Sequence, residues 1–311
     1  MASASTNTKT KVRIGDLVFS RAASFAGIGI LITLAAVALF LFIQAIPALS
    51  PEADFDGKAE NLLTYVAPYV FGTLYGSVIA LAIATPLAVG IALYISHFAN
   101  RKLAQSLGYV IDLLAAIPSV VYGLWGILVL APFLNPTYVW LNENLGWLPF
   151  FEGQVSATGR TMLTVGIVLA IMVLPIMAAL IREVFLQTPR LHEEAALALG
   201  ATRWEMIKMA VLPFGRPGII SAAMLGLGRA LGETMAVAMV LSPSSVISFA
   251  LLTSQNPNTI AANIALDFPE SGGDYRSLLI ATGLMLFFIT MVINMFARYV
   301  ISRRAEFSGA N

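Results

Sequence analysis

The stretch EEAALALGATRWEMIKMAVLP, Glu193–Pro213, decides the fold of this chain. It is charged, rich in alanine and interrupted by Gly200, whereas the segments on both sides of it are apolar enough to enter a bilayer. A chain that holds such a segment in water between two apolar runs presents it to a partner. The composition of the rest of the chain shows what kind of protein that is.

The composition is that of a polytopic membrane protein. Of the 311 residues, 58% are hydrophobic and only 11% are charged, whereas soluble domains carry about 25% charged residues. The chain has no cysteine, which excludes disulfides, cysteine-ligated zinc and iron–sulfur clusters. With His97 and His192 as its only histidines, the sequence also argues against a histidine-built metal site. We expect no cofactor.

Apolar runs predict six transmembrane helices, because a spanning helix needs about 20 mainly apolar residues. The first run is longer than the ~7–15 residues of a signal-peptide core, so we expect it to be retained. The expected fold is an all-α membrane protein with an N-terminal tail (1–21), one six-helix domain (22–304) and a C-terminal tail (305–311). The predicted helices lie at about 22–46, 69–96, 107–133, 161–181, 217–241 and 277–300.

The basic residues predict the orientation, since cytoplasmic loops are enriched in lysine and arginine. An even number of spans puts both termini on one side, together with the stretch around Gly200. The other side carries only Lys58, Arg160 and Arg276. We therefore expect both termini in the cytoplasm. The basic residues on that side are Lys9, Lys11, Arg13, Arg21, Arg101, Lys102, Arg182, Arg190, Arg203, Lys208, Arg216, Arg298, Arg303 and Arg304.

The stretch before Gly200 predicts a short helix. Thr188 is placed to cap it with Pro189 at its first position, where the missing N–H of proline is tolerated. Glu193 and Glu194 follow near the helix start, where the helix dipole favours carboxylates. Gly200 is placed to end the helix in a left-handed conformation. The helix is about 16 Å long at ~1.5 Å per residue, too short to cross a bilayer.

A second helix is predicted directly after the glycine. Thr202 and Glu205 have the spacing of a capping box, and Pro213 is expected to end the helix. The first helix shows mostly alanine, which lets the surface of a partner approach closely. The alternative is an amphipathic helix lying on the membrane, but the run AALAL lacks the bulky anchors for that. We expect two short helices that dock into a groove of another protein.

This stretch resembles the EAA signature of the permeases of ABC importers. In that family, Glu-Ala-Ala is followed after three residues by glycine and nine residues later by Ile-x-Leu-Pro; here Ala210 stands at the isoleucine position. The resemblance implies the type I ABC importer permease (MetI-like) fold, with a cytoplasmic coupling loop at about 182–216 that docks on an ATPase subunit. The coupling residues that it implies are Glu193, Glu194, Ala195, Ala196, Gly200, Leu212 and Pro213.

The chain lacks the means to bind ATP itself. It has no G-x-x-x-x-G-K-[ST] loop, and its only Gly-Lys pair, Gly57-Lys58, is on the predicted external side. A phosphate cradle needs that glycine-rich turn before a helix. We therefore expect no enzymatic activity in this chain and ATP hydrolysis by partner subunits.

Three ionisable residues, Asp112, Arg229 and Glu233, lie inside predicted spans. Such residues cost about 2.5–3.5 kcal/mol at mid-helix and by default mark functional sites. For Asp112, a structural or snorkelling role is expected. Arg229 and Glu233 are one turn apart on the predicted helix 217–241. They form either a self-contained ion pair that fixes packing, or a substrate pathway in which the planar guanidinium compensates a passing oxyanion.

A second resemblance concerns the substrate. GRALGETMAVAMVL (Gly228–Leu241) and IPSVVYGLWGILVLAPF (Ile117–Phe133) are similar to segments of the phosphate-specific importer permeases, of the PstC type more than of its sister PstA. The resemblance implies a bacterial plasma (inner) membrane protein. It implies a heterodimer with a second permease subunit, two ATPase subunits, an external phosphate-binding protein, and a part for Arg229 and Glu233 in phosphate passage.

Three alternatives remain open at this point. The chain is a permease half for another oxyanion such as molybdate or sulfate, or the sister phosphate subunit, or a stand-alone secondary transporter. The EAA stretch does not separate the first two from a PstC-type permease. The third predicts inverted repeats with broken helices at the midplane, and the sequence shows no repeat.

Overall fold

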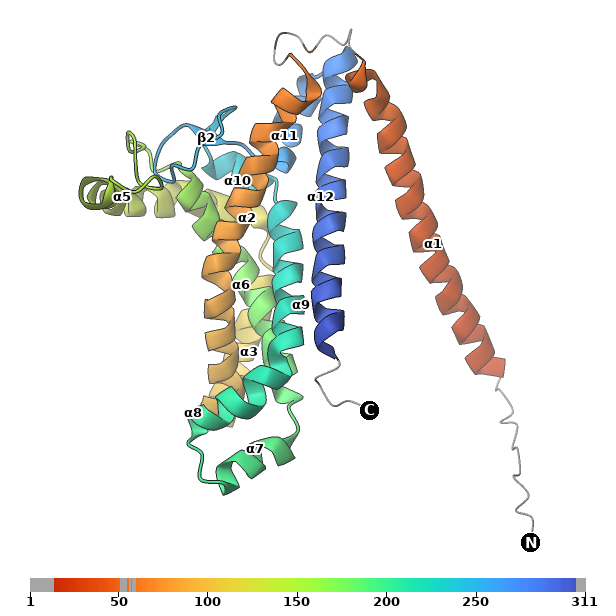
Figure 1. Ribbon diagram of the computed structural model, residues 1–311, viewed down its shortest axis with the longest axis vertical. Helices are drawn as coiled ribbons and strands as arrows, with labels where there is room; N and C mark the ends of the chain where they lie inside the picture. Colours follow the sequence, from red (N-terminus) through yellow and green to blue (C-terminus); the bar gives the residue numbers. More distant parts are fainter. Residues whose placement is uncertain (1–13, 51–54, 56, 58–59, 306–311) are drawn as a thin grey trace.

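The computed structural model describes residues 14–50, 55, 57 and 60–305. The ends of the predicted tails, 1–13 and 306–311, lie outside the described residues. The first helix, α1, already begins at Ile14, inside the stretch 1–21. The helices that run along the long axis (Figure 1) are α1 (Ile14–Ala45), α2 (Leu62–Leu93), α3 (Arg101–Ala115), α6 (Met162–Leu186), α9 (Leu212–Leu231) and α12 (Gly273–Ala305).

The predicted all-α membrane fold is confirmed. Six helical segments of the described residues are long and apolar enough to cross a membrane. One of them joins the short elements 203–211 to α9, and another extends α2 through a π turn, η2 (Tyr94–Phe98). The segments are 15–49, 62–98, 119–145, 162–186, 203–231 and 273–300.

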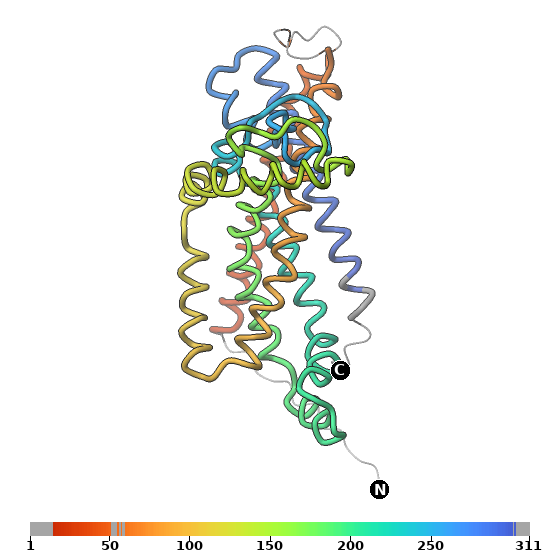
Figure 2. The backbone as a smooth tube through the Cα atoms, turned by 90° about the vertical axis from the view of Figure 1, so that its left-hand side faces the viewer, coloured from red at the N-terminus to blue at the C-terminus, as the bar shows by residue number. Residues whose placement is uncertain are grey.

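The prediction of a single membrane helix at about 107–133 is wrong. α3 ends at Ala115, and a new helix begins after Pro118, whose ψ of 141° is extended. The residue before a proline avoids the helical region, which ends α3 ahead of Ile117. Figures 1 and 2 show α3 along the long axis, whereas the later part of the new helix lies across it. That helix comprises α4 (Ser119–Trp125), the π turn η3 (Gly126–Leu130) and α5 (Ala131–Leu145).

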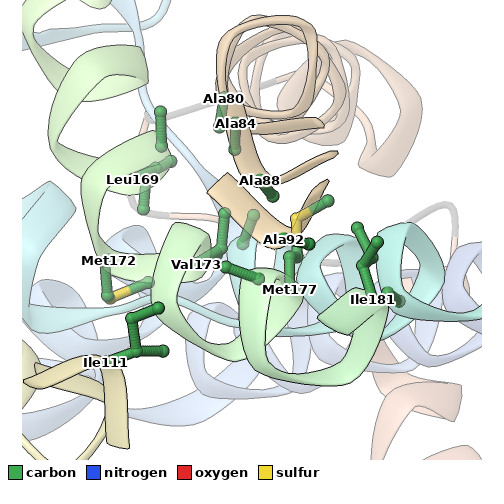
Figure 3. Packing of buried hydrophobic residues seen from close by; sticks show 14 of the residues in the cluster. Ala80, Ala84, Ala88, Ala92, Ile111, Leu169, Met172, Val173, Met177 and Ile181 are labelled. Atoms are coloured by element: carbon green, nitrogen blue, oxygen red, sulfur yellow. The ribbon is translucent and has the colours of Figure 1, made fainter. Parts of the chain in front are cut away.

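The core lies between α2 and α6. On α2, alanines spaced four residues apart form a column with no exposed surface, and it faces the large side chains of α6 (Figure 3). Helices in lipid associate through close packing rather than the hydrophobic effect, so small residues at the contact are the main device. The column is Ala80, Ala84, Ala88 and Ala92, and it faces Leu169, Val173, Met177 and Ile181.

The segment between α9 and α12 covers the end of the helix bundle away from residues 190–206 (Figure 1). It contains α10 (Met235–Val240), a two-stranded parallel pair, β1 (Pro243–Ser244) with β2 (Asn256–Pro257), then α11 (Ile260–Asp267) and the 3₁₀ turn η5 (Phe268–Glu270). The longest helix of this segment is α11.

Gly72 holds this segment against α2. A Cβ built on Gly72 would lie 2.3 Å from the backbone oxygen of Asn258 and 2.7 Å from that of Pro257. Next to this contact, the hydroxyl of Thr73 accepts a hydrogen bond from the N–H of Ile260 at 2.9 Å. Gly72 and Gly76 form a GxxxG pair on α2. Gly72 packs against the loop, and Gly76 packs against Met162 of α6.

Replacing Gly72 with alanine is expected to destabilise the protein. The added methyl group meets backbone atoms that have no rotamer to change, and overpacking of this kind costs about 1–3 kcal/mol. Gly90→Ala is the matched control on the same helix, because nothing lies within 4 Å of its added Cβ. Thermal aggregation of the two purified variants in detergent measures the difference. Equal midpoints would show that the loop does not depend on this contact.

Candidate functional site

The predicted coupling segment lies at one end of the molecule, as α7 (Arg190–Ala198) (Figure 1). The predicted Thr188 cap is wrong. The helix begins one residue later than expected, with Pro189 in extended backbone at its cap. The Thr188 hydroxyl is buried and has no hydrogen-bond partner among the described residues. No side chain caps the first turn of α7 there, and Pro189 precedes the helix in extended backbone.

The glycine elbow is confirmed. Gly200 has φ +86°, a backbone conformation that residues other than glycine and asparagine rarely adopt. The N–H of Gly200 bonds Leu197 O at 3.0 Å, and that of Ala201 bonds Ala196 O at 3.2 Å. These bonds satisfy the last carbonyls of α7.

The predicted capping box after the elbow is also confirmed. The N–H of Thr202 donates to the Glu205 carboxylate at 2.8 Å, and the N–H of Glu205 donates to the Thr202 hydroxyl at 3.3 Å. This box opens α8 (Arg203–Met206). The elbow therefore has a fixed geometry on both sides of Gly200.

Pro213 does not end the second helix, so that prediction is wrong. α8 continues through a π turn, η4 (Ile207–Val211), into α9, and the combined helix runs from Arg203 to Leu231. In the π turn the N–H of Leu212 reaches back to Ile207 O. The register changes immediately before Pro213, so the proline stands at the start of a new α segment, where its missing N–H is tolerated.

One face of α7 packs on the helix bundle, and the other face is exposed. Ala196 is buried, whereas Glu194 and Ala195 are exposed, and Leu199 is 87% exposed. On the inner side, a carboxylate oxygen of Glu193 lies 3.5 Å from Nε2 of His97 in η2. The segment is thus joined to the end of α2 as well as to α9, while apolar and acidic side chains remain available for another protein.

Arg229 and Glu233 are not on one continuous helix, and the predicted one-turn spacing is wrong. α9 ends at Leu231, the chain opens over Gly232 to Thr234, and α10 starts at Met235. Within the described residues, no ion pair joins the two side chains. Glu233 is buried, and its Oε1 accepts a hydrogen bond from the N–H of Ala236 at 3.0 Å. Glycine favours such a break because it has the lowest helix propensity after proline.

Charged groups hold α10 at both of its ends. Glu233 accepts from the first turn, and Arg160 donates from Nη2 to Leu241 O at 2.8 Å and to Met239 O at 3.2 Å at the last turn. Both charges match the helix dipole. The sequence identified Arg160 only as an external basic residue. Its partners are about eighty positions away along the chain, and no local pattern points to them.

Arg229 borders a pocket between α6, α9 and α12. Its Nε is buried and has no hydrogen-bond partner within the described part of the chain. A buried donor without a partner is costly. Asp112, the third ionisable residue of the spans, lies apart in the last turn of α3. The pocket holds about 450 Å³ and is lined by Ile176, Ser221, Met224, Leu225, Gly228, Arg229 and Asn294.

Comparison with known proteins agrees with this architecture. Residues 84–306 match the family model described as "Binding-protein-dependent transport system inner membrane component". The fold is that of ABC importer permeases. A bacterial ABC transporter involved in alginate import superposes with a TM-score of 0.59 over 91% of this chain and 96% of its own, at 16% identity.

Curated relatives are similar over nearly the whole chain. The phosphate transport system permease protein PstC 2 of Mycobacterium tuberculosis is 44% identical over 304 residues, 93% of this chain and 92% of the relative. The PstC protein of Mesorhizobium japonicum is 38% identical over 97% of this chain and 95% of the relative. The chain belongs to the binding-protein-dependent transport system inner membrane components, the permease subunits of ABC importers, and within them to the PstC-type permeases.

Proposed function

We propose that this chain carries inorganic phosphate across the bacterial plasma membrane as one half of a permease heterodimer. The other members are the sister permease, two ATPase subunits and an external phosphate-binding protein. The chain itself catalyses no covalent step. The observation that carries the proposal is the buried Nε of Arg229, which has no hydrogen-bond partner among the described residues and borders a pocket between spans, in a chain 44% identical to a phosphate transport permease.

Arg229 suits an anion in transit. The pocket beside it is open at the surface of the single chain, and a charged side chain facing lipid costs about 2.5–3.5 kcal/mol. We infer that this face meets the sister permease rather than lipid. A guanidinium offers several N–H donors in a planar fork that matches the oxygens of phosphate. Closed by the second permease, the pocket becomes part of the passage.

Glu233 contributes by stabilising the start of α10, which we propose lines that passage. Its carboxylate caps α10 directly after the break that follows Arg229. We propose that it fixes where α9 stops and α10 starts, and so positions the guanidinium. The break between the two helices is the place where the passage can open and close.

The ATPase acts through α7. We propose that the exposed face of α7 enters a cleft of an ATPase subunit and that α8–α9, a continuous helix, carries the movement to Arg229 near its other end. The link between Glu193 and His97 adds the end of α2 to the same moving unit. ATP binding then turns the two permease halves from the inward-facing to the outward-facing arrangement, and ATP hydrolysis returns them to the inward-facing one. The proposed coupling residues are Glu193, Glu194, Ala195, Ala196, Gly200, Leu212 and Pro213.

The proposed orientation places α7 in the cytoplasm with both termini. The start of α1, the end of α12 and α7 lie toward the same end of the molecule (Figure 1). Arg101 and Lys102 begin α3 at that end. The position of these two basic residues supports a cytoplasmic placement of this end under the positive-inside rule.

Transport by a reconstituted complex tests this function. The chain is co-expressed with its sister permease and ATPase subunits, purified and placed in proteoliposomes with the binding protein outside. We expect uptake of radiolabelled phosphate that depends on internal ATP, and no uptake by the chain alone. Uphill phosphate uptake by the chain alone would contradict the proposal, as would a complex that imports sulfate or molybdate and leaves phosphate outside.

A further inference from the structure

Asn294 is a polar residue inside an apolar helix, six residues before the end of its membrane segment. It lies in the membrane segment 273–300 of α12, between Val292–Ile293 and Met295–Phe296. Its side chain is exposed in the single chain, and no hydrogen bond to its amide is found within the described residues. Polar groups at this depth are rare and face the bundle interior or a water-filled cavity. Asn294 therefore needs a partner that the isolated chain lacks.

The pocket of Arg229 supplies the setting. Asn294 is the residue of α12 that lines it, across from Ser221 and Arg229 on α9. The Ser221 hydroxyl donates to Pro217 O of its own helix at 2.9 Å, so its donor is already used. The guanidinium and the amide are the two groups of this pocket that have donors to spare, and they come from different helices.

The chemistry of the two groups is complementary. Arg229 offers donors only, whereas an asparagine amide offers two N–H donors and one carbonyl acceptor. Near neutral pH, phosphate exposes oxygens that accept and at least one P–OH that donates. An anion in this pocket can accept hydrogen bonds from the N–H groups of Arg229 and donate one from its P–OH to Oδ1 of Asn294. The pair thus serves both kinds of oxygen on one tetrahedral ion.

We propose that Asn294 is a substrate-contacting residue of the passage and forms, with Arg229, a binding site for a hydrogen-bearing tetrahedral oxyanion. The proposal rests on the proposed function and extends it to a helix for which the sequence predicted no site. It assigns α12 a direct part in transport, besides its packing on α1 and α9.

Asn294→Leu in the reconstituted complex tests the proposal. We expect phosphate uptake to fall about tenfold, the loss that follows removal of one hydrogen bond to a charged group. Co-purification of the sister permease and the ATP hydrolysis rate should stay unchanged. Asn294→Asp keeps the shape but adds a negative charge, and we expect uptake at least as low, because the carboxylate repels an anion. Thr290→Val is the matched control, since its hydroxyl bonds Phe287 O of its own helix at 2.8 Å.

Each other outcome overturns the inference. Wild-type uptake by Asn294→Leu removes Asn294 from the passage. Loss of the sister permease from purified Asn294→Leu would make the residue an assembly contact instead. Normal uptake by Asn294→Asp would show that no anion comes close to it. In all three cases phosphate import by the wild-type complex, and its loss in an Arg229 variant, would leave the proposed function intact.

Discussion

Arg229→Ala is expected to reduce phosphate uptake by about 100-fold, since two charge-assisted hydrogen bonds of about 1.5 kcal/mol each are lost. The guanidinium is near the far end of α9, its Nε is buried without a partner, and Glu233 is engaged with the N–H of Ala236. Removing the Arg229 side chain therefore breaks no ion pair within the described residues. Uptake of radiolabelled phosphate by the reconstituted complex measures the effect.

Two further variants show which property of Arg229 matters. Arg229→Lys keeps the charge but loses the planar fork, so we expect uptake between those of the wild type and the alanine variant. Arg298→Ala removes an exposed arginine of α12 and should leave uptake unchanged. If the double variant Arg229→Ala, Glu233→Ala transported phosphate well, the two residues would be packing elements and the site would lie elsewhere.

Gly200→Val is expected to lower uptake more than tenfold while the chain stays in the membrane. A β-branched residue at φ +86° is strained by about 1–2 kcal/mol, which is comparable to the roughly 1–3 kcal/mol that the two hydrogen bonds of the elbow contribute. The angle between α7 and α8 then changes. No atom lies within 4 Å of a Cβ at this position, so the loss comes from the backbone and not from a clash.

Gly200→Asn separates these causes. Asparagine tolerates the left-handed conformation although it adds a side chain of similar size to valine, so we expect nearly normal uptake. Co-purification of the ATPase subunits with each variant gives the second readout, and the valine variant should retain fewer of them. Normal uptake by Gly200→Val would show that α7 does not transmit force through a fixed elbow.

The long helices could be predicted because lipid leaves the backbone few options, and runs of about 20 apolar residues then define spans. The breaks were harder to predict. Pro118 follows the end of one helix, whereas Pro213 lies in a helix that continues because a π turn precedes the proline. The sequence shows a proline within an apolar stretch in both cases. Gly232 breaks a helix where Gly226 does not.

The site shows the same division. Arg229 stood out because a charge inside a span is costly, and the elbow stood out because capping residues have fixed spacing. Asn294 did not, since a single neutral amide barely changes the hydropathy of its segment. The partners of Arg160 depend on where α10 lies, which is set by packing between distant segments.

We propose that the π turn η4 is a swivel in the helix from Arg203 to Leu231, close to the end of the helix that follows α7. From Val211 to Arg229 the helix extends about 27 Å at ~1.5 Å per residue, so a tilt of about 10° at the swivel displaces the guanidinium by about 5 Å, close to one helical pitch. In the proposed transporter, a lever of that length would turn a small rotation next to the ATPase subunit into a shift wide enough to release a bound ion.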